Sequence, residues 1–487
     1  MKMKNPALLL LFVVIVVVRG RCPPPDDIAP CQCRTRGPSI QVRCVNSMMS
    51  RILEAMMNIR NVVDRVDVLI LENNNIPHLP SRALGSVKVN RLFLENNRIQ
   101  TIDRNAFAGV EGYITEIYLK EPGLRQIPTD AIDFLKELTV FSVESSEITE
   151  MPRVVGLQKL KLFKIDGSNI TDIQDFTLKN LPGLRYLHVT NSKLKRLETG
   201  ILENLPFLLL ANFTGNDISW IHPRSFRYME QLEQVILAHN SIGDASIVGQ
   251  AVKVIKTIKT LDISNNRMDK LRERSFVDIN SLEELDLSNN NIVLMQRGAL
   301  TRLPRLKKLD LRSNDIRSFH SDIFLDVPQL MEIDLHDNKI SRLSDVSFLQ
   351  GSVPLLRVLD LGLNLIEDIP YGALRGYPTL EKLVLGWNQI SGLAKDAFAD
   401  LPTLLELDLS RNRLTSENLD GNVFNLRNLQ ILDLSENKLS RIDRSLLGSL
   451  GSLRRLNLAQ NGITEMAEDS FQPVRREIIF QIFLVDF

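Results

Sequence analysis

The sequence has no excess of charge of either sign and few of the residues that serve catalysis. It contains 59 basic and 59 acidic residues, so its formal net charge is zero. No global field therefore steers the chain toward nucleic acid or an acidic membrane, and we expect no nucleic-acid partner. No nucleophile elbow, phosphate loop or zinc signature is present. The six histidines are scattered: His78, His188, His222, His239, His320 and His336. We expect no enzyme activity, no cofactor and no metal site.

Long hydrophobic runs are absent except at the amino terminus. Lys2 and Lys4 precede an apolar run over Ala7–Val18, and Val18-Arg19-Gly20 is an acceptable small-residue cleavage site. This pattern predicts a secretory signal over residues 1–20. A membrane anchor is the alternative, but about a dozen apolar residues cannot span ~30 Å of hydrocarbon. We therefore expect a secreted, extracellular protein without a membrane span.

Cysteine is scarce and confined to one place. Cys22, Cys31, Cys33 and Cys44 follow the expected cleavage site closely, and none occurs after them. An even number of clustered cysteines in a secreted chain predicts a disulfide framework. Zinc is the other use of a Cys-x-Cys cluster, but no histidine is nearby and the compartment does not favour it.

What the chain has in abundance is one repeated pattern. The stretch Ser281–Pro304 contains Leu282, Leu285 and Leu287, followed by Asn290 and Ile292. The leucine alternation predicts a short strand with one buried face, and the asparagine can satisfy backbone groups where the chain turns. The asparagine slot recurs at intervals of 22 to 26 residues, in seventeen places: Asn74, Asn97, Pro122, Ser146, Ser168, Ser192, Asn216, Asn240, Asn266, Asn290, Asn314, Asn338, Asn364, Asn388, Asn412, Asn437 and Asn461.

This pattern resembles the leucine-rich repeat superfamily, in particular its 24-residue extracellular class. The cysteine cluster is similar to the amino-terminal cap of such proteins, which implies the pairs Cys22–Cys33 and Cys31–Cys44. The opening CPPPDDIAPCQC and the irregular early repeats resemble secreted arthropod proteins similar to the non-catalytic subunit of oplophorus-luciferin 2-monooxygenase, and more distantly chaoptin, Slit and Toll ectodomains. That resemblance implies a role in binding or stabilising another protein.

The expected fold is an α/β, right-handed leucine-rich repeat solenoid (a horseshoe) of about 17 repeats. Its concave face would be a parallel sheet, and its convex side mostly irregular. Residues 21–65 form the disulfide cap, in which Met48–Val63 has helical spacing, and residues 66–473 form the array. Residues 474–487 are an incomplete last repeat or a tail, in which Ile479, Ile482 and Leu484 fit strand slots. A second copy or another partner could cover the uncapped edge there.

The residue between the two strand leucines should point away from the core. These residues form what we call the inner column. In the carboxyl-terminal half the column is mostly aspartate, and calcium is one explanation of it. The other explanation needs no cation: neighbouring basic residues neutralise parts of the column, and Leu-Asp-Leu is a frequent strand sequence in this superfamily. The column runs Asp262, Asp286, Asp310, Asp334, Asp360, Val384, Asp408, Asp433 and Asn457.

In the amino-terminal half, apolar residues occupy the inner column or the position two residues before it. Exposed apolar stripes mark interaction sites, so we expect a protein-binding face here. Its residues are Val68, Ile70, Phe93, Tyr118, Val140, Leu162, Tyr186 and Leu210. The alternative is drift of irregular repeats, or a cap folded over them.

Two glycosylation acceptors are present, at Asn169 and Asn212. A glycan on Asn212 would stand in the inner column and confine a ligand to one side of it. The sequence as a whole predicts a secreted, non-catalytic scaffold that recognises another secreted or cell-surface protein through its concave face. The alternative is an extracellular-matrix or cell-adhesion protein.

Overall fold

The computed structural model describes residues 22–85, 87–151, 153–154, 156–173, 178, 181–202, 205–319, 322–343, 353–419, 423–467, 470–472 and 479–481. The predicted signal over residues 1–20 lies outside them, as does most of the predicted tail. The chain divides into two compact units, Met1–Glu147 and Ile148–Phe487, each of which is described by itself. The structure confirms a parallel-sheet solenoid of about 17 coils, with few helices.

The first unit begins with the disulfide cap. The 3-10 helix η1 (Pro25–Ile28) leads into β1 (Cys31–Arg36), which pairs antiparallel with β2 (Ser39–Val45). Disulfides join Cys22 to Cys33 and Cys31 to Cys44, the same pairs that the resemblance implies. The helical spacing after the cap forms α1 (Met49–Val62), whose buried face is Ile52, Ala55, Met56 and Ile59.

The coils of the first unit continue this sheet in parallel. The cap strand β2 pairs with β3 (Arg65–Glu72), and β5 (Lys88–Glu95), β7 (Glu116–Lys120) and β8 (Val140–Glu144) follow in order. The cap thus covers the edge of the first repeat, because its own strand occupies that edge. The outer side of this unit carries β4 (His78–Leu79), β6 (Thr101–Ile102) and the short helix α2 (Thr129–Ile132).

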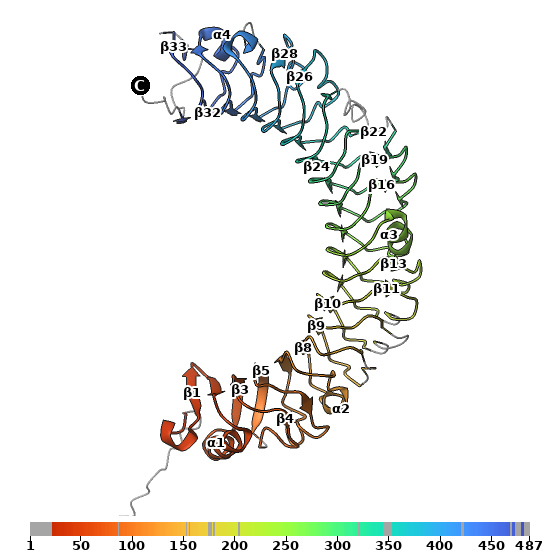
Figure 1. Ribbon diagram of the computed structural model, residues 1–487, viewed down its shortest axis with the longest axis vertical. Helices are drawn as coiled ribbons and strands as arrows, with labels where there is room; N and C mark the ends of the chain where they lie inside the picture. Colours follow the sequence, from red (N-terminus) through yellow and green to blue (C-terminus); the bar gives the residue numbers. More distant parts are fainter. Residues whose placement is uncertain are drawn as a thin grey trace, which may run out of the picture. The chain divides into compact units, whose positions relative to one another are not determined.

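The second unit is a longer ladder of parallel strands, which Figure 1 shows along the inner edge of this unit's curve. Each strand pairs with the next at equivalent positions of the repeat. The ladder consists of β9 (Leu162–Asp166), β10 (Tyr186–Thr190), β12 (Leu210–Asn212), β14 (Gln234–Ile236), β15 (Thr260–Asp262), β18 (Glu284–Asp286), β21 (Lys308–Asp310), β24 (Glu332–Asp334), β25 (Val358–Asp360), β27 (Lys382–Val384), β29 (Glu406–Asp408), β30 (Ile431–Asp433), β32 (Arg455–Asn457) and β34 (Ile479–Gln481).

The outer edge of the second unit carries two-residue strands and a few short helices (Figure 1). The strands are β11 (Arg196–Leu197), β13 (Trp220–Ile221), β16 (Lys270–Leu271), β17 (Phe276–Val277), β19 (Leu294–Met295), β20 (Leu300–Thr301), β22 (Ser318–Phe319), β23 (Phe324–Leu325), β26 (Asp368–Ile369), β28 (Gly392–Leu393), β31 (Arg441–Ile442) and β33 (Glu465–Met466). The helices are α3 (Ala245–Val252), η3 (Ser416–Leu419) and α4 (Arg444–Leu447). Phenylalanines such as Phe276, Phe398 and Phe424 are buried on this side and fill the core opposite the strands.

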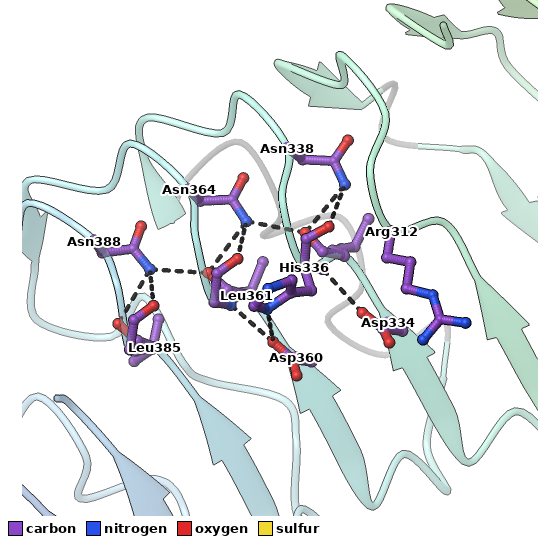
Figure 2. Close-up of polar contacts among 12 residues, drawn as sticks. Arg312, Asp334, His336, Asn338, Asp360, Leu361, Asn364, Leu385 and Asn388 are labelled. Carbon is purple, nitrogen blue, oxygen red and sulfur yellow. Dashed lines mark hydrogen bonds and ion pairs between the residues drawn. The ribbon is translucent and has the colours of Figure 1, made fainter. Parts of the chain in front are cut away.

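The asparagines of the repeated slot, which we call the ladder asparagines, hold successive coils together. The amide nitrogen of Asn364 donates to the carbonyl oxygens of Leu361 (3.1 Å) and Gly362 (3.0 Å) in its own coil and of Leu335 (2.9 Å) in the preceding coil. Its Oδ1 accepts the backbone N–H of Ile340 at 3.0 Å. Figure 2 shows the same arrangement repeated at Asn338, Asn364 and Asn388. Each asparagine thus satisfies buried backbone groups of two coils.

Two irregular slots differ from the sequence interpretation. The repeat spacing predicts Pro122 and Ser146 in the asparagine slot, but the buried side chains there are Glu121 and Ser145. The Glu121 carboxylate accepts the backbone N–H groups of Asn97 and Ile99 and the Asn97 side-chain amide. At the first slot the assignment was wrong because the longer side chain of Glu121 reaches the same place from one residue earlier. Burial raises the pKa of Glu121, and these hydrogen bonds, which lower it, offset the effect only in part. At the second slot, the buried Ser145 hydroxyl donates to the carbonyl oxygens of Pro122 and Leu124.

The last described strand also departs from the predicted register. In β34, Phe480 pairs with Leu456, a slot that the sequence pattern assigned to Ile482. The pattern was wrong by two residues because it followed aliphatic spacing alone. Phe480 stands 24 residues after Leu456, which is the usual repeat length.

Candidate functional site

In the first unit, the strand register brings three predicted face residues together. Ile70 of β3 pairs with Phe93 of β5, and Phe93 pairs with Tyr118 of β7. The rings of Phe93 and Tyr118 are stacked, with centroids 4.5 Å apart and planes within 7°. All three side chains are half-buried. The two rings stack face to face, and with Ile70 they form a small apolar cluster that stays partly accessible on the inner side of the sheet.

Polar groups frame this aromatic pair. The Tyr118 hydroxyl donates to the Glu116 carboxylate at 3.1 Å, and partial burial together with the Glu116 charge raises the pKa of Tyr118. The predicted residues Val68 and Val140 do not adjoin each other, because Arg91 and Glu116 occupy the positions between them. The apolar surface of this unit is therefore narrower than the sequence pattern indicates. It is centred on Phe93 and Tyr118.

In the second unit, the remaining predicted face residues form a contiguous row. Tyr186 of β10 pairs with Leu162 of β9 on one side and with Leu210 of β12 on the other. Tyr186 is exposed, and both leucines are half-buried. The inner column beside them is polar, with Lys164, His188 and Asn212. The predicted face thus consists of two clusters, one within each unit.

The two predicted glycosylation acceptors have different settings. Asn212 lies at the end of β12, where its Oδ1 accepts the backbone N–H and the hydroxyl of Thr214 at 2.9 and 2.6 Å. Asn169 is half-buried just after β9. The contacts of Asn212 hold its sequon in a turn at the edge of the inner face.

The aspartates of the inner column have a structural task. In each regular coil the Oδ1 atom of the column aspartate accepts the backbone N–H two residues later, as from Asp286 to Ser288 (2.8 Å) and from Asp360 to Gly362 (2.8 Å). The side chain thereby closes the turn that follows the strand. Within the described ranges, no group of three or more His, Cys, Asp or Glu side chains could hold a metal ion. The turn explains the aspartate column without a cation.

The middle of this column carries the strongest electrostatic strain. Asp286, Asp310 and Asp334 stand side by side in register, and Asp310 is only 6% exposed. Burial raises the pKa of Asp310 to about 6. The two neighbouring carboxylates also raise this pKa, whereas the backbone N–H and the guanidinium of Arg312 lower it. Burial likewise raises the Asp360 pKa, although His336 lies 3.5 Å from its Oδ1. Figure 2 shows Asp334 and Asp360 at the ends of neighbouring strands, with the His336 side chain beside Asp360.

Replacing Asp310 with asparagine should change the pH dependence of stability. The folded-state pKa of about 6 exceeds the ordinary value of 3.8, so folding favours the protonated acid. The contribution of the protonated Asp310 to the free energy of unfolding is fully present below about pH 4 and is lost as pH rises through about 6. Asp310→Asn should raise the free energy of unfolding at pH 7.5, by on the order of 1–3 kcal/mol, and have little effect at pH 4. Urea unfolding at both pH values measures this. Equal pH dependence in wild type and variant would contradict it.

Comparisons with known proteins agree with the repeat. A family model described as "Leucine rich repeat" matches residues 182–242, 256–316, 304–353, 328–390, 354–414, 378–425 and 415–463. The chain is 26% identical to mouse podocan-like protein 1 over 45% of its own length and 43% of that protein. It is 27% identical to human lumican over 45% of the chain and 65% of lumican. It is 28% identical to Toll-like receptor 3 of Boselaphus tragocamelus over 41% of the chain and 26% of that receptor. The chain spans less than two thirds of these relatives.

Solved structures share the fold. A leucine-rich repeat protein of Leptospira interrogans superimposes with a TM-score of 0.60 at 23% identity, covering 77% of this chain and 90% of that one. A chain of the Drosophila Toll–Spatzle complex gives a TM-score of 0.71 at 17% identity, covering 94% and 68%. Among the described residues of this chain, no helix has the length and apolar character needed to cross a membrane.

Proposed function

The chain belongs to the leucine-rich repeat family, and we propose that it is a secreted, non-catalytic scaffold that binds another extracellular protein through its inner face. The observation that carries this proposal is the stacked pair Phe93–Tyr118. Two aromatic rings that stack on each other are already ordered, so they lose little side-chain entropy when a partner covers them. Tyrosine and other aromatic residues dominate the cores of protein interfaces for this reason.

The inner face suits a macromolecule better than a small substrate. Its strands present at least two side chains per coil on an open surface, whereas catalytic pockets enclose most of a small ligand. The inner-column polar groups already have partners in the fold, such as the column aspartates with the backbone and Tyr118 with Glu116. The accessible apolar side chains of this face include the cluster around Phe93 in the first unit and the Leu162–Tyr186–Leu210 row in the second.

The relatives support a binding role outside the cell. Podocan, lumican and Toll-like receptor 3 are scaffolds of the extracellular-matrix or receptor type. The two disulfides suit an oxidising compartment. We also propose the narrower role that the cap motif implies, a subunit that binds and stabilises a different secreted protein. The lumican and podocan matches favour a second candidate, a matrix or cell-adhesion protein.

Affinity capture from the native extracellular fluid tests the proposal. The baits are wild type, Phe93→Asp, Tyr118→Asp and the control Phe134→Asp, which adds the same charge to an exposed aromatic outside the inner column. Wild type and control should retain the same secreted protein in mass spectrometry. The inner-face variants should retain at least tenfold less, because the aspartate is desolvated on binding. Equal capture by all four folded baits would contradict the proposal. Recovery of copies of this chain alone would favour adhesion.

We propose that Asn169 and Asn212 carry N-linked glycans in the secreted protein. Asn212 lies in the inner column of the second unit, so a glycan there would shield the sheet around His188 and Ile236. A ligand on the Leu162–Tyr186–Leu210 row would then approach from the side of Leu162. Site-resolved glycopeptide mapping should find both sites occupied, and an unmodified Asn212 removes the argument.

A further inference from the structure

In the second unit, the residue just before the asparagine slot of each coil has a left-handed backbone, including the two coils in which serine occupies the slot. Glycine adopts this conformation freely, and asparagine, aspartate and histidine tolerate it better than other residues. Up to Asp337 the sequence mostly follows that preference, and beyond it does not. The positions are Gly167, Asn191, Gly215, His239, Asn265, Asn289, Ser313, Asp337, Leu363, Trp387, Arg411, Glu436 and Gln460.

Leu363 and Trp387 are the apolar departures from this preference. Their φ angles are 51° and 58°, in a region that L side chains with a branched or aromatic Cγ rarely occupy. Core packing does not compensate for the strain, because Leu363 is 40% exposed and Trp387 is 51% exposed. Strained residues that gain nothing from burial are a sign of an interaction site.

Two further side chains complete what we call the Trp387 patch: Leu363, Leu365, Trp387 and Arg411. Leu365, on the other side of the buried Asn364, is also 40% exposed. The Arg411 guanidinium lies over the Trp387 ring, 3.8 Å from its centroid, and pairs with Glu436 at 2.5 Å. The guanidinium therefore holds the indole in place, and Trp387 remains 51% exposed.

The inner column beside this patch is acidic with one apolar break. Val384 stands between Asp360 and Asp408 in register. Each of these aspartates uses Oδ1 to accept a backbone N–H. Figure 2 shows Asp334 and Asp360 near Asn364 and Asn388, the asparagines that follow Leu363 and Trp387 in the chain.

Buried glycines stand between the column and the patch, and neighbouring side chains pack closely against them. A Cβ added at Gly362 would approach His336 Nδ1 to 2.7 Å, and one at Gly386 would approach Ser410 Oγ to 2.9 Å. At the same position, earlier coils have Ser264, Ser288, Arg312 and His336. The two glycines therefore add no side chain of their own between the inner column and the residues Leu363 and Trp387.

We propose that the Trp387 patch binds an extended segment of a partner protein in which apolar side chains alternate with basic ones. The apolar side chains would cover Leu363, Val384 and Trp387, and the basic ones would meet Asp334, Asp360 and Asp408. Charge complementarity commits the patch to a cationic segment, because these carboxylates stand in register on β24, β25 and β29, with Val384 between the last two. This site lies wholly within the second unit and does not depend on Phe93 or Tyr118.

The two tryptophans of the chain give a direct test. Trp387 and Trp220 are the only ones, and Trp220 is 43% exposed on the outer strand β13. The probe is a synthetic dodecapeptide that alternates arginine with leucine, titrated at physiological salt. Tryptophan emission should change in Trp220→Phe, which retains Trp387, and should stay constant in Trp387→Phe. The opposite pattern, or no binding to the wild type, would overturn the proposal.

Affinity measurements with a labelled peptide separate charge from apolar contact. Replacing the peptide's arginines with glutamate, or its leucines with serine, should weaken binding at least tenfold. Trp387→Asn should do the same, as should Asp360→Asn combined with Asp408→Asn, in which asparagine keeps the turn acceptor. Trp220→Asn should bind as the wild type does. Equal affinity for the arginine and glutamate peptides, or an unchanged affinity in Trp387→Asn, would overturn the proposal.

Leu363→Asn separates binding from folding. Asparagine tolerates the left-handed backbone, so the thermal midpoint should rise by roughly 2 °C while peptide affinity falls about fivefold. A fall in both would show that Leu363 serves the fold, and would overturn its place in the patch.

Discussion

Asn364→Ala is expected to lower the free energy of unfolding by roughly 3–5 kcal/mol. Asn364 is 4% exposed, and its side chain bonds to three carbonyl oxygens and one backbone N–H across two coils. Alanine leaves those groups buried without partners, and each orphaned group costs about 1–3 kcal/mol. Little apolar surface changes, so hydrogen bonding decides the result.

Urea unfolding measures this effect, with Asn291→Ala as the matched control. Asn291 is an exposed asparagine one residue after a ladder position, so its removal should cost within about 0.5 kcal/mol. If Asn364→Ala costs no more than the control, the ladder asparagines do not hold the coils together.

Removing the Cys31–Cys44 bridge is the second large effect, at roughly 2–5 kcal/mol. The two residues stand opposite each other in β1 and β2, and both are buried. The bridge closes a loop with a sequence separation of 13, and closing a loop of about this size contributes about 3 kcal/mol by chain entropy. The lost bridge should loosen β2, on which β3 is paired.

A double variant with serine at both positions tests this second prediction. Thermal unfolding should shift down, and proteolysis should cut first within residues 31–45. The Cys22–Cys33 pair supplies the comparison, because both of its cysteines are half-buried and their loss leaves a smaller gap in the core. An unchanged midpoint in the Cys31/Cys44 variant would show that the cap folds without the bridge.

The repeat itself was predictable because one physical requirement fixes many residues. A coil cannot bury its apolar strand alone, so leucines and the asparagine recur with the coil length. That rule gave the strands, as at Leu285, and the interior position of Asn290. It failed at Glu121, where a longer side chain enters the slot from the neighbouring position. It also failed at Ile482, because aliphatic spacing alone does not fix register.

The candidate sites were only partly predictable. Alternation placed Phe93 and Tyr118 on one face, but their stacking depends on how the strands pair. The sequence suggested one apolar face, whereas Arg91 and Glu116 interrupt the flanking column and the chain divides after Glu147. Trp387 gave no signal in the sequence, since its significance comes from its backbone angle and the adjacent glycine.

The proposed binding of another extracellular protein depends most on the inner face of the first unit. The most direct measurement is the dissociation constant of the captured secreted partner for wild type and for the Phe93→Asp/Tyr118→Asp double variant, by surface plasmon resonance. The account predicts at least a hundredfold weaker binding with the fold intact by circular dichroism, since aromatic anchors each contribute about 2 kcal/mol or more. Equal dissociation constants for the two folded proteins would contradict it.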